Sequence, residues 1–311
     1  SDLLNRCSAS LYRKLAPRIQ ETCGIPALGY LEQQDVFSLP SRHLGLVTPD
    51  AVSGLQQKMV ALAEAAARTL DLASIRALAA SAPAFSYDDT LFIPPPPADR
   101  GPAPAPRIAY ARDEAFCFYY RENLALLSAF GAELIPFSPL HDKGLPATCS
   151  ALYLGGGYPQ LFPLQLAENT SMLQSLRAFC RGGAPVFAEC GGFLYLHEQL
   201  EDEQGRSWPM AGVIPARAFR THSLQRFGYI TLTAREDGLL ACAGETLRAH
   251  EFHYWESEAP GAAFHAEKPQ SSRSWECATT TPTLYAGFPH LYLPSAPNAA
   301  RRFVDACAEN C

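Results

Sequence analysis

The residue with the clearest chemical potential is Cys190, which lies between an apolar run, PVFAE (185–189), and two consecutive glycines. A strand that ends at a cysteine and is followed by small residues and a helical run has the layout of a nucleophile elbow. Ala188 and Gly192 occupy the flanking positions, where a larger side chain would clash. Most single cysteines are inert core residues, but this combination predicts a nucleophilic thiol at the carboxyl end of a sheet. The N-terminus of the helix is expected to favour its thiolate form.

Glycines near this cysteine are candidates for stabilising the product of its attack. A thiolate that attacks an amide needs hydrogen-bond donors for the developing oxyanion. The backbone N–H of Gly191 directly follows the nucleophile, and Gly156 and Gly157 belong to a glycine loop, GGGY (155–158), that ends an apolar strand. A plain tight turn is the alternative interpretation of this loop.

A general acid must protonate the leaving ammonia, and histidine is the usual choice near neutral pH. His290, in LYAGFPHLYLP, is the first candidate among eight histidines because it follows a β-like run late in the chain. His250 and His253, in AHEFHYWE, are the competitors. Sequence spacing alone does not decide between them.

Short apolar strands alternate with helices in the part of the chain that holds these residues. The expected strands are 107–111, 132–137, 151–156 and 185–189, and the expected helices are 115–130 and 164–183. This alternation predicts an α/β fold with a mostly parallel sheet covered on both faces. From residue 207 onward the expected pieces are shorter and richer in β structure.

Length and a proline-rich break predict two domains. The chain has 311 residues, more than one core usually contains. PPPPADRGPAPAP (94–106) continues neither a helix nor a central strand, so we expect a linker there, with a surface loop as the alternative. Residues 1–93 contain a helical stretch at 51–81 and a buried strand end near 25–30, and resemble part of a domain rather than a whole one.

Composition argues against several classes of function. The net charge of −6 disfavours nucleic acid and anionic membranes as main partners. No apolar stretch reaches the roughly 18 residues that span a bilayer. The ten cysteines form no CxxC pair and no zinc-ligand spacing, so no metal site is expected. Without a signal peptide, we expect reduced thiols and a cytoplasmic location.

Several stretches taken together resemble the cobyrinic acid a,c-diamide synthase family. Its members are glutamine amidotransferases of corrin-ring biosynthesis. The matching stretches are NR (5–6), GIPALGYL (24–31), SRHLGLV (41–47), RIAYARDEAFCFYYRENLALL (107–127), ALYLGGGYPQ (151–160), FAECGGFLYL (187–196) and AHEFHYWE (249–256). The resemblance implies a class I glutamine amidotransferase-like domain over 107–311. It implies that residues 1–93 are the C-terminal remnant of a P-loop, dethiobiotin synthetase-like domain. The implied reaction is glutamine-dependent amidation of the a and c carboxylates of cobyrinic acid.

Carried over residue by residue, the resemblance puts the nucleophile at Cys190 and its partner at His290, within AGFPHLYL (286–293). Many class I amidotransferases have a glutamate two residues after that histidine, where this chain has Tyr292; the resemblance implies a dyad instead. Gln160 stands where a glutamate often follows GGGYP. The resemblance also makes Arg42 and His43 candidates for contacting anionic groups of the substrate.

The resemblance implies cofactors that this chain does not itself accommodate. Family members begin with a P-loop, and no GxxxxGK[ST] occurs in the 311 residues. Mg²⁺ and ATP are therefore expected in the full enzyme, bound by a missing P-loop segment or chain, and this chain alone is expected to be competent only as a glutaminase. L-Glutamine and a corrinoid acceptor are the expected small-molecule partners, and a homodimer is a candidate assembly.

Other functions compatible with the same residues remain open. Cobyric acid synthase, sirohydrochlorin amidases and cell-wall glutamate amidases use similar glutaminase domains, although RHLGLV and HEFHY favour the a,c-diamide group. A non-catalytic interaction or ammonia-docking module is the alternative from a different class. A labelling experiment with a glutamine analogue separates it from an active glutaminase.

Overall fold

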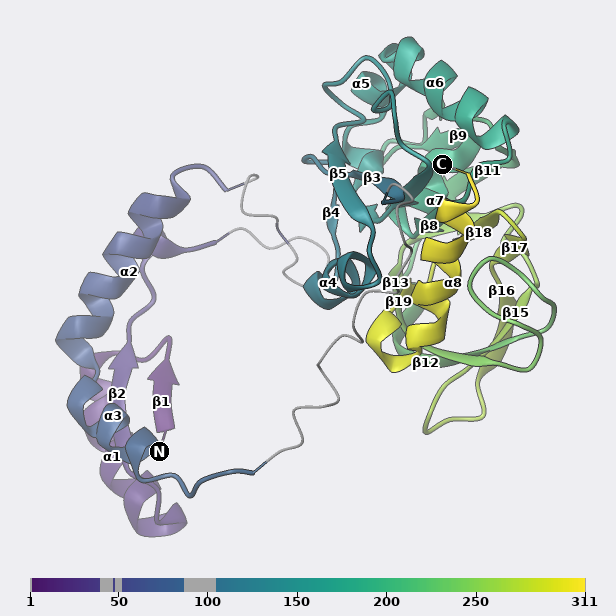
Figure 1. Cartoon of the computed structure of the whole chain (residues 1–311). Helices are drawn as coiled ribbons and strands as arrows, with labels where there is room; N and C mark the ends of the chain where they lie inside the picture. The colour runs from purple at the N-terminus through teal and green to yellow at the C-terminus, as the bar shows by residue number, and fades with distance from the viewer. Residues whose placement is uncertain (1, 40–46, 48–51, 87–104, 311) are drawn as a thin grey trace. The chain divides into compact units, whose positions relative to one another are not determined.

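The computed structural model describes residues 2–39, 47, 52–86 and 105–310. The chain divides into two compact units, Ser1–Asp88 and Asp89–Cys311, which we call unit 1 and unit 2 (Figure 1). Nearly all of the expected linker, 94–106, lies outside the described residues, and so do Arg42 and His43. The domain boundaries predicted from the sequence therefore remain predictions.

In its described residues, unit 1 is a pair of parallel strands accompanied by three α-helices. Its elements are β1 Asp2–Asn5, α1 Ala9–Cys23, β2 Ala27–Leu31, the short 3₁₀ helix η1 Asp35–Phe37, α2 Leu55–Thr69 and α3 Leu72–Ala80. The helical stretch expected at 51–81 is thus two helices. They separate at Asp71, whose carboxylate caps α3 by accepting a hydrogen bond from the Ser74 N–H at 3.0 Å.

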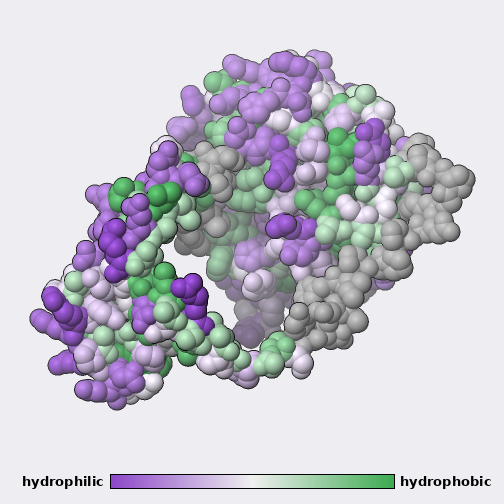
Figure 2. Space-filling view, turned by 60° about the vertical axis from the view of Figure 1, so that its left-hand side comes forward, coloured by the Kyte–Doolittle hydropathy of each residue, from purple (hydrophilic) through white to green (hydrophobic). Residues whose placement is uncertain are grey.

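Unit 1 buries little of its apolar surface. Helices α1 and α3 have no fully buried residue, and α2 has only Ala65. In β2 only Gly29 is buried, so the expectation of a buried strand end is met at one residue. Hydrophobic residues are visible among hydrophilic ones on the surface of the smaller lobe (Figure 2). The exposed large hydrophobic residues of unit 1 are Leu3, Leu11, Ile25, Val36, Leu39, Met59, Val60, Leu72, Leu78 and Phe85.

Unit 2 is organised around a six-stranded sheet with the strand order β17-β18-β8-β6-β3-β5. Its strands are β3 Arg107–Ala111, β5 Glu133–Phe137, β6 Ala151–Leu154, β8 Val186–Glu189, β17 Thr279–Thr281 and β18 Leu284–Gly287. Every pairing is parallel except the edge pair β17–β18. The predicted α/β fold with a mostly parallel sheet is confirmed.

Successive residues of a strand point to opposite faces of the sheet, so each strand contributes side chains to two cores. Helices cover both of these faces. The helices are α4 Arg121–Ala129, α5 Pro163–Glu168, α6 Thr170–Arg181, α7 Gly191–Leu196 and α8 Pro297–Ala308. On one face Tyr153 and Phe187 pack in a core that includes residues of α4 and α8. On the other, Leu152 and Ala188 pack with residues of α6 and α7. Within the described ranges, no helix is long and apolar enough to cross a membrane.

Two further sheets occupy the later part of unit 2, as the β-rich pattern after residue 207 predicts. The five-stranded antiparallel sheet has the order β16-β15-β12-β13-β19, and the four-stranded sheet the order β10-β9-β11-β14. The strands are β9 His197–Glu201, β10 Ser207–Pro209, β11 Ile214–Arg220, β12 Arg226–Ala234, β13 Thr246–His253, β14 Trp255–Ser257, β15 Phe264–Glu267, β16 Ser274–Cys277 and β19 His290–Leu291. Short 3₁₀ turns at Pro159–Leu161 (η4) and Leu293–Ser295 (η5) complete the unit.

The structure corrects two of the predicted helices. The helix expected at 115–130 begins only at Arg121, because Phe116–Phe118 forms strand β4, which pairs with β7 (Gly156–Gly157). The helix expected at 164–183 breaks at Asn169. The amide of this buried residue donates hydrogen bonds to the carbonyl oxygens of Pro139 and Asp142, at 2.9 and 2.8 Å. An interior asparagine with partners on another loop outweighs helix propensity here.

Candidate active site

Cys190 occupies the sharp turn between β8 and α7 that the sequence predicts. Its backbone has φ 45° and ψ −102°, a strained conformation for a residue with a side chain. Two backbone bonds fix the turn: the Cys190 N–H donates to the Gly287 carbonyl at 2.8 Å, and the Leu194 N–H donates to the Cys190 carbonyl at 2.9 Å. A side chain at Gly192 would put its Cβ 2.1 Å from the Leu154 oxygen, so only glycine fits there.

The glycine loop lies directly against this turn. A Cβ on Gly191 would lie 2.9 Å from the Gly157 nitrogen, which places the two peptide groups in contact. Burial raises the pKa of the Cys190 thiol to about 12, while hydrogen bonds from the N–H groups of Gly191 and Gly157 act in the opposite direction. The backbone donors favour the thiolate, but burial outweighs them, so the net shift is opposite to the one expected from the helix N-terminus. Two backbone N–H groups that act on the Cys190 sulfur are also suited to an oxyanion formed beside it.

His290 reaches the same loop from another sheet. Strand β19 pairs with β13, so that His290 lies opposite His250 and Leu291 opposite Ala249. A Cβ on Gly156 would lie 2.3 Å from His290 Cε1, which means that the imidazole packs on the Gly156 backbone. Burial lowers the pKa of His290 to about 4, with smaller effects from His250 and His253. Burial thus favours the uncharged form of each group, the thiol and the imidazole.

The competing histidines are engaged elsewhere. His253 is buried, with Nδ1 2.6 Å from the Trp255 carbonyl oxygen and Nε2 2.8 Å from Glu251 Oε1. Because a carbonyl oxygen only accepts, Nδ1 carries the proton. His250 lies beside His290 in the strand pairing and stacks edge-on against Phe227 and Tyr229. Of the three candidates, His290 is therefore the one that contacts the glycine loop.

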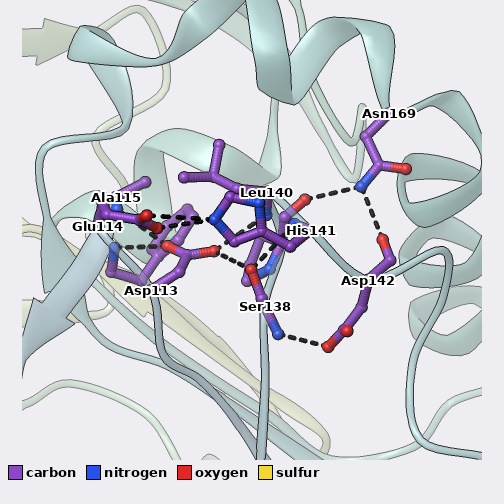
Figure 3. A network of polar contacts seen from close by, with 10 residues as sticks. Asp113, Glu114, Ala115, Ser138, Leu140, His141, Asp142 and Asn169 are labelled. Carbon is purple, nitrogen blue, oxygen red and sulfur yellow. Dashed lines mark hydrogen bonds and ion pairs between the residues drawn. The ribbon is translucent and has the colours of Figure 1, made fainter.

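A network of polar contacts ties the segment that leads into β4 to the turn at residues 138–142 (Figure 3). Asp113 Oδ1 accepts from the N–H groups of Ala115 and Phe116, at 2.9 and 3.1 Å. Asp113 Oδ2 accepts from the Ser138 hydroxyl at 2.8 Å and the Leu140 N–H at 2.9 Å. Since Phe116 pairs with Gly157, this carboxylate fixes the strand on which the glycine loop rests.

Sequence reasoning missed a buried polar group next to Cys190. Glu189 is 2% exposed; its Oε1 accepts from the Leu291 N–H at 2.6 Å and its Oε2 from the Tyr153 hydroxyl at 2.8 Å. Asn123, fully buried, donates to the Leu291 carbonyl at 2.7 Å and accepts from the Leu293 N–H at 2.9 Å. One signal was present: a glutamate closes the otherwise apolar strand PVFAE, where burial requires a partner.

The predicted residues thus divide into two groups. Cys190, His290, Gly156, Gly157 and Gly191 come together, whereas Arg42 and His43 lie outside the described residues. Gln160 is buried in the adjoining η4 turn, and its side-chain oxygen has no hydrogen-bond partner. Among the described residues, no group of three or more His, Cys, Asp or Glu side chains is arranged to hold a metal ion.

Comparison with known proteins gives the family. Residues 107–293 match the model of the CobB/CobQ-like glutamine amidotransferase domain. Cobyrinate a,c-diamide synthase from Caldanaerobacter subterraneus subsp. tengcongensis is 35% identical over 299 residues, which are 96% of this chain and 64% of that protein. The synthase of the same name from Salmonella typhimurium is 36% identical over 98% of this chain and 66% of its own. The chain spans about two thirds of the length of these relatives, and it belongs to the CobB/CobQ-like glutamine amidotransferase domain family.

Proposed function

We propose that this chain is the glutaminase part of a glutamine-dependent amide ligase, with Cys190 as nucleophile and His290 as general acid and base. The arrangement at the glycine loop carries the proposal. The backbone N–H groups of Gly157 and Gly191 act to lower the pKa of the Cys190 thiol, and the imidazole packs on Gly156. A thiol, a proton acceptor and oxyanion donors are the three parts that acyl transfer requires.

The proposed reaction uses these groups in two stages. First, His290 takes the thiol proton while the sulfur bonds to the side-chain carbonyl carbon of L-glutamine. The oxyanion then accepts hydrogen bonds from Gly157 and Gly191, the C–N bond breaks, and the imidazolium returns the proton to the leaving ammonia. Second, His290 takes a proton from water, which attacks the thioester and releases glutamate and the free thiol. The sum is glutamine and water converted to glutamate and ammonia.

We also propose that the ammonia is used to amidate the a and c carboxylates of cobyrinic acid in the complete enzyme. The names of the similar proteins support this acceptor, since both are cobyrinate a,c-diamide synthases. The related acceptors of cobyric acid synthase, sirohydrochlorin amidases and cell-wall glutamate amidases are outcomes that a substrate assay would reveal. The a,c-diamide acceptor is preferred because those relatives match nearly the whole chain.

The residues of this chain do not fit the MgATP that such a ligase uses. Phosphate binding in a P-loop needs a run of glycine N–H groups followed by Lys-Ser/Thr, which the sequence lacks. The glycines described in unit 1 have other roles: Gly24 ends α1, Gly54 precedes α2, and Gly29 presses against the backbone of Thr69 and Leu70. We therefore propose that Mg²⁺ and ATP bind to a P-loop segment or chain outside this sequence.

The same proposal extends to the domain organisation. We propose that residues 1–93 are part of a larger P-loop synthetase domain, 94–106 a linker and 107–311 the amidotransferase domain. The exposed apolar side chains and the absence of fully buried residues in α1 and α3 support an incomplete unit, since a self-sufficient domain buries an apolar core.

Ammonia release from glutamine tests the proposed chemistry directly. The full 311-residue chain is incubated with glutamine, and glutamate and ammonia are measured together for the wild type and Cys190→Ser. Equal amounts of both products from the wild type, and none above background from the variant, are expected. Equal release by the two proteins would refute the role of Cys190, and a folded but inactive wild type would support the non-catalytic alternative.

A further inference from the structure

Many enzymes of this class orient the histidine with a carboxylate two residues further along the chain, and this chain has no carboxylate at that position. Two residues after His290 stands Tyr292, whose ring packs edge-on against Tyr120 at 5.3 Å between centroids. A general acid and base must keep its ring within hydrogen-bond reach of the reacting atoms. Some other feature therefore has to fix the position of a short strand, β19, that carries the histidine on only two residues.

Glu189 is placed to supply that restraint. It lies at the end of β8, immediately before Cys190, and its Oε1 accepts from the N–H of Leu291, the residue after His290, at 2.6 Å. Its Oε2 is held by the Tyr153 hydroxyl at 2.8 Å. One side chain thus connects the strand of the nucleophile with the strand of the histidine. In a dry interior such a bond is strong, and an unpaired partner is costly.

Asn123 completes the restraint at the same residue, Leu291. Its amide donates to the Leu291 carbonyl at 2.7 Å and, at 3.4 Å, to the Tyr153 hydroxyl; its oxygen accepts from the Leu293 N–H at 2.9 Å. Both backbone groups of Leu291 are therefore held by side chains, in addition to the pairing of β19 with β13. All the atoms involved are buried, so water does not compete for these bonds.

We propose that Glu189 is the positioning residue for His290, acting through the backbone N–H of Leu291 in place of a carboxylate bonded to the imidazole. Both carboxylate oxygens are occupied by protein groups, so Glu189 orients the base without exchanging a proton with the substrate. The inference deepens the proposed function and rests on it, since it requires Cys190 and His290 to be the reacting pair.

The test compares substitutions at Glu189 in the full chain. The number of competent sites is first titrated with 6-diazo-5-oxo-norleucine, and kcat and KM for glutamine are then measured per labelled site. Glu189→Ala removes the acceptor; a misplacement of about 1 Å costs up to about 10²-fold in rate, so kcat should fall about 10²-fold. KM should change little, because the glycine N–H groups remain. Glu189→Gln keeps an oxygen for the Leu291 N–H and should stay within about threefold of the wild type in kcat.

Two controls separate positioning from a general loss of structure. Glu236→Ala removes an exposed glutamate and should leave kcat unchanged. Glu189→Asp withdraws the carboxylate by one methylene and should lower kcat per labelled site about tenfold. If Glu189→Ala does not fold, this variant decides whether Glu189 positions His290.

Each outcome has a distinct meaning. A wild type that fails to label refutes the proposed function itself. A labelled Glu189→Ala with wild-type kcat per site overturns the positioning role, and so does a Glu189→Gln as slow as Glu189→Ala, because that would assign the effect to the charge. Where only Glu189→Asp folds, wild-type kcat in that variant overturns the proposal as well.

Discussion

The turn that carries Cys190 and the strand that carries His290 differ in how many parts of the chain are needed to position them. The turn is contiguous: β8, Cys190, Gly191 and α7 follow one another, and the strained backbone of Cys190 is held by one bond to Leu194 and one to Gly287 of the paired strand β18. The histidine strand has two residues and is fixed by groups from three distant segments, which supply Glu189, Asn123 and the pairing strand β13. The proposed nucleophile is therefore placed mainly by its local sequence, whereas the proposed base is positioned by tertiary contacts.

This difference predicts that loss of the base is the most damaging change on the histidine side. General acid–base groups contribute about 10²–10⁴-fold to rate, so His290→Ala should lower glutaminase kcat by about 10³-fold. His222→Ala, which removes an exposed histidine, is the matched control and should have no effect. If His250→Ala or His253→Ala abolished activity while His290→Ala retained it, the choice of base would be wrong.

A smaller effect is expected where the two regions meet. A methyl group on Gly156 would lie 2.3 Å from His290 Cε1, so Gly156→Ala must displace the imidazole. We expect kcat to fall by up to about 10²-fold with little loss of stability, because a side chain rather than backbone yields. Gly144→Ala, whose added methyl would make an ordinary 3.4 Å contact with Ser175 Oγ, is the control. Unchanged kcat in Gly156→Ala would contradict the contact between loop and histidine.

On the nucleophile side the corresponding change should damage folding. At Gly192 a Cβ would lie 2.1 Å from the Leu154 oxygen in the central sheet, and that backbone cannot yield. Overpacking of this kind costs about 1–3 kcal/mol or more, so Gly192→Ala should lower the free energy of unfolding by at least that amount. The three tryptophans, Trp208, Trp255 and Trp275, all lie in unit 2, and their fluorescence reports its unfolding in urea. Wild-type stability would show that the elbow tolerates a side chain there.

The smallest effect concerns the pH dependence of stability. Burial raises the pKa of Glu189 from 4.5 to about 8, so between these values the folded chain holds a proton that the unfolded chain releases. Its contribution to stability therefore falls as pH rises from 4.5 to 8. Glu189→Gln removes this titration. The free energy of unfolding of the variant minus that of the wild type should then increase from pH 5 to pH 8, measured by tryptophan fluorescence, whereas a constant difference would contradict the burial of an ionisable carboxyl.

The contrast between the two regions also explains what the sequence could predict. The strand 107–111, the parallel sheet and the turn at Cys190 follow from local pattern, and the structure has them at nearly the expected positions. The helix expected from residue 115 fails because Asp113 folds its loop back so that Phe116 pairs with Gly157. The spacing of apolar residues does not reveal such a bond, because its partner strand comes from a later part of the sequence.

Local sequence pattern was equally limited in predicting the residues of the candidate active site. The glycine loop and Cys190 stand out by residue type, but His290 had two competitors that only the contact with Gly156 separates. Glu189 and Asn123 gave even less signal, since a carboxylate and an amide are commonplace until both are found buried around Leu291. Partners about 100 residues or more apart in sequence are assembled by topology rather than by spacing.

Covalent labelling by 6-diazo-5-oxo-norleucine tests the central claim most directly, because this glutamine analogue reacts only where a nucleophile and a glutamine site coincide. The intact mass and the labelled peptide of the wild-type chain are measured beside Cys190→Ser. The account predicts one adduct, located on Cys190 and lost in the variant. An adduct that persists in Cys190→Ser, or that maps to another cysteine, would contradict it.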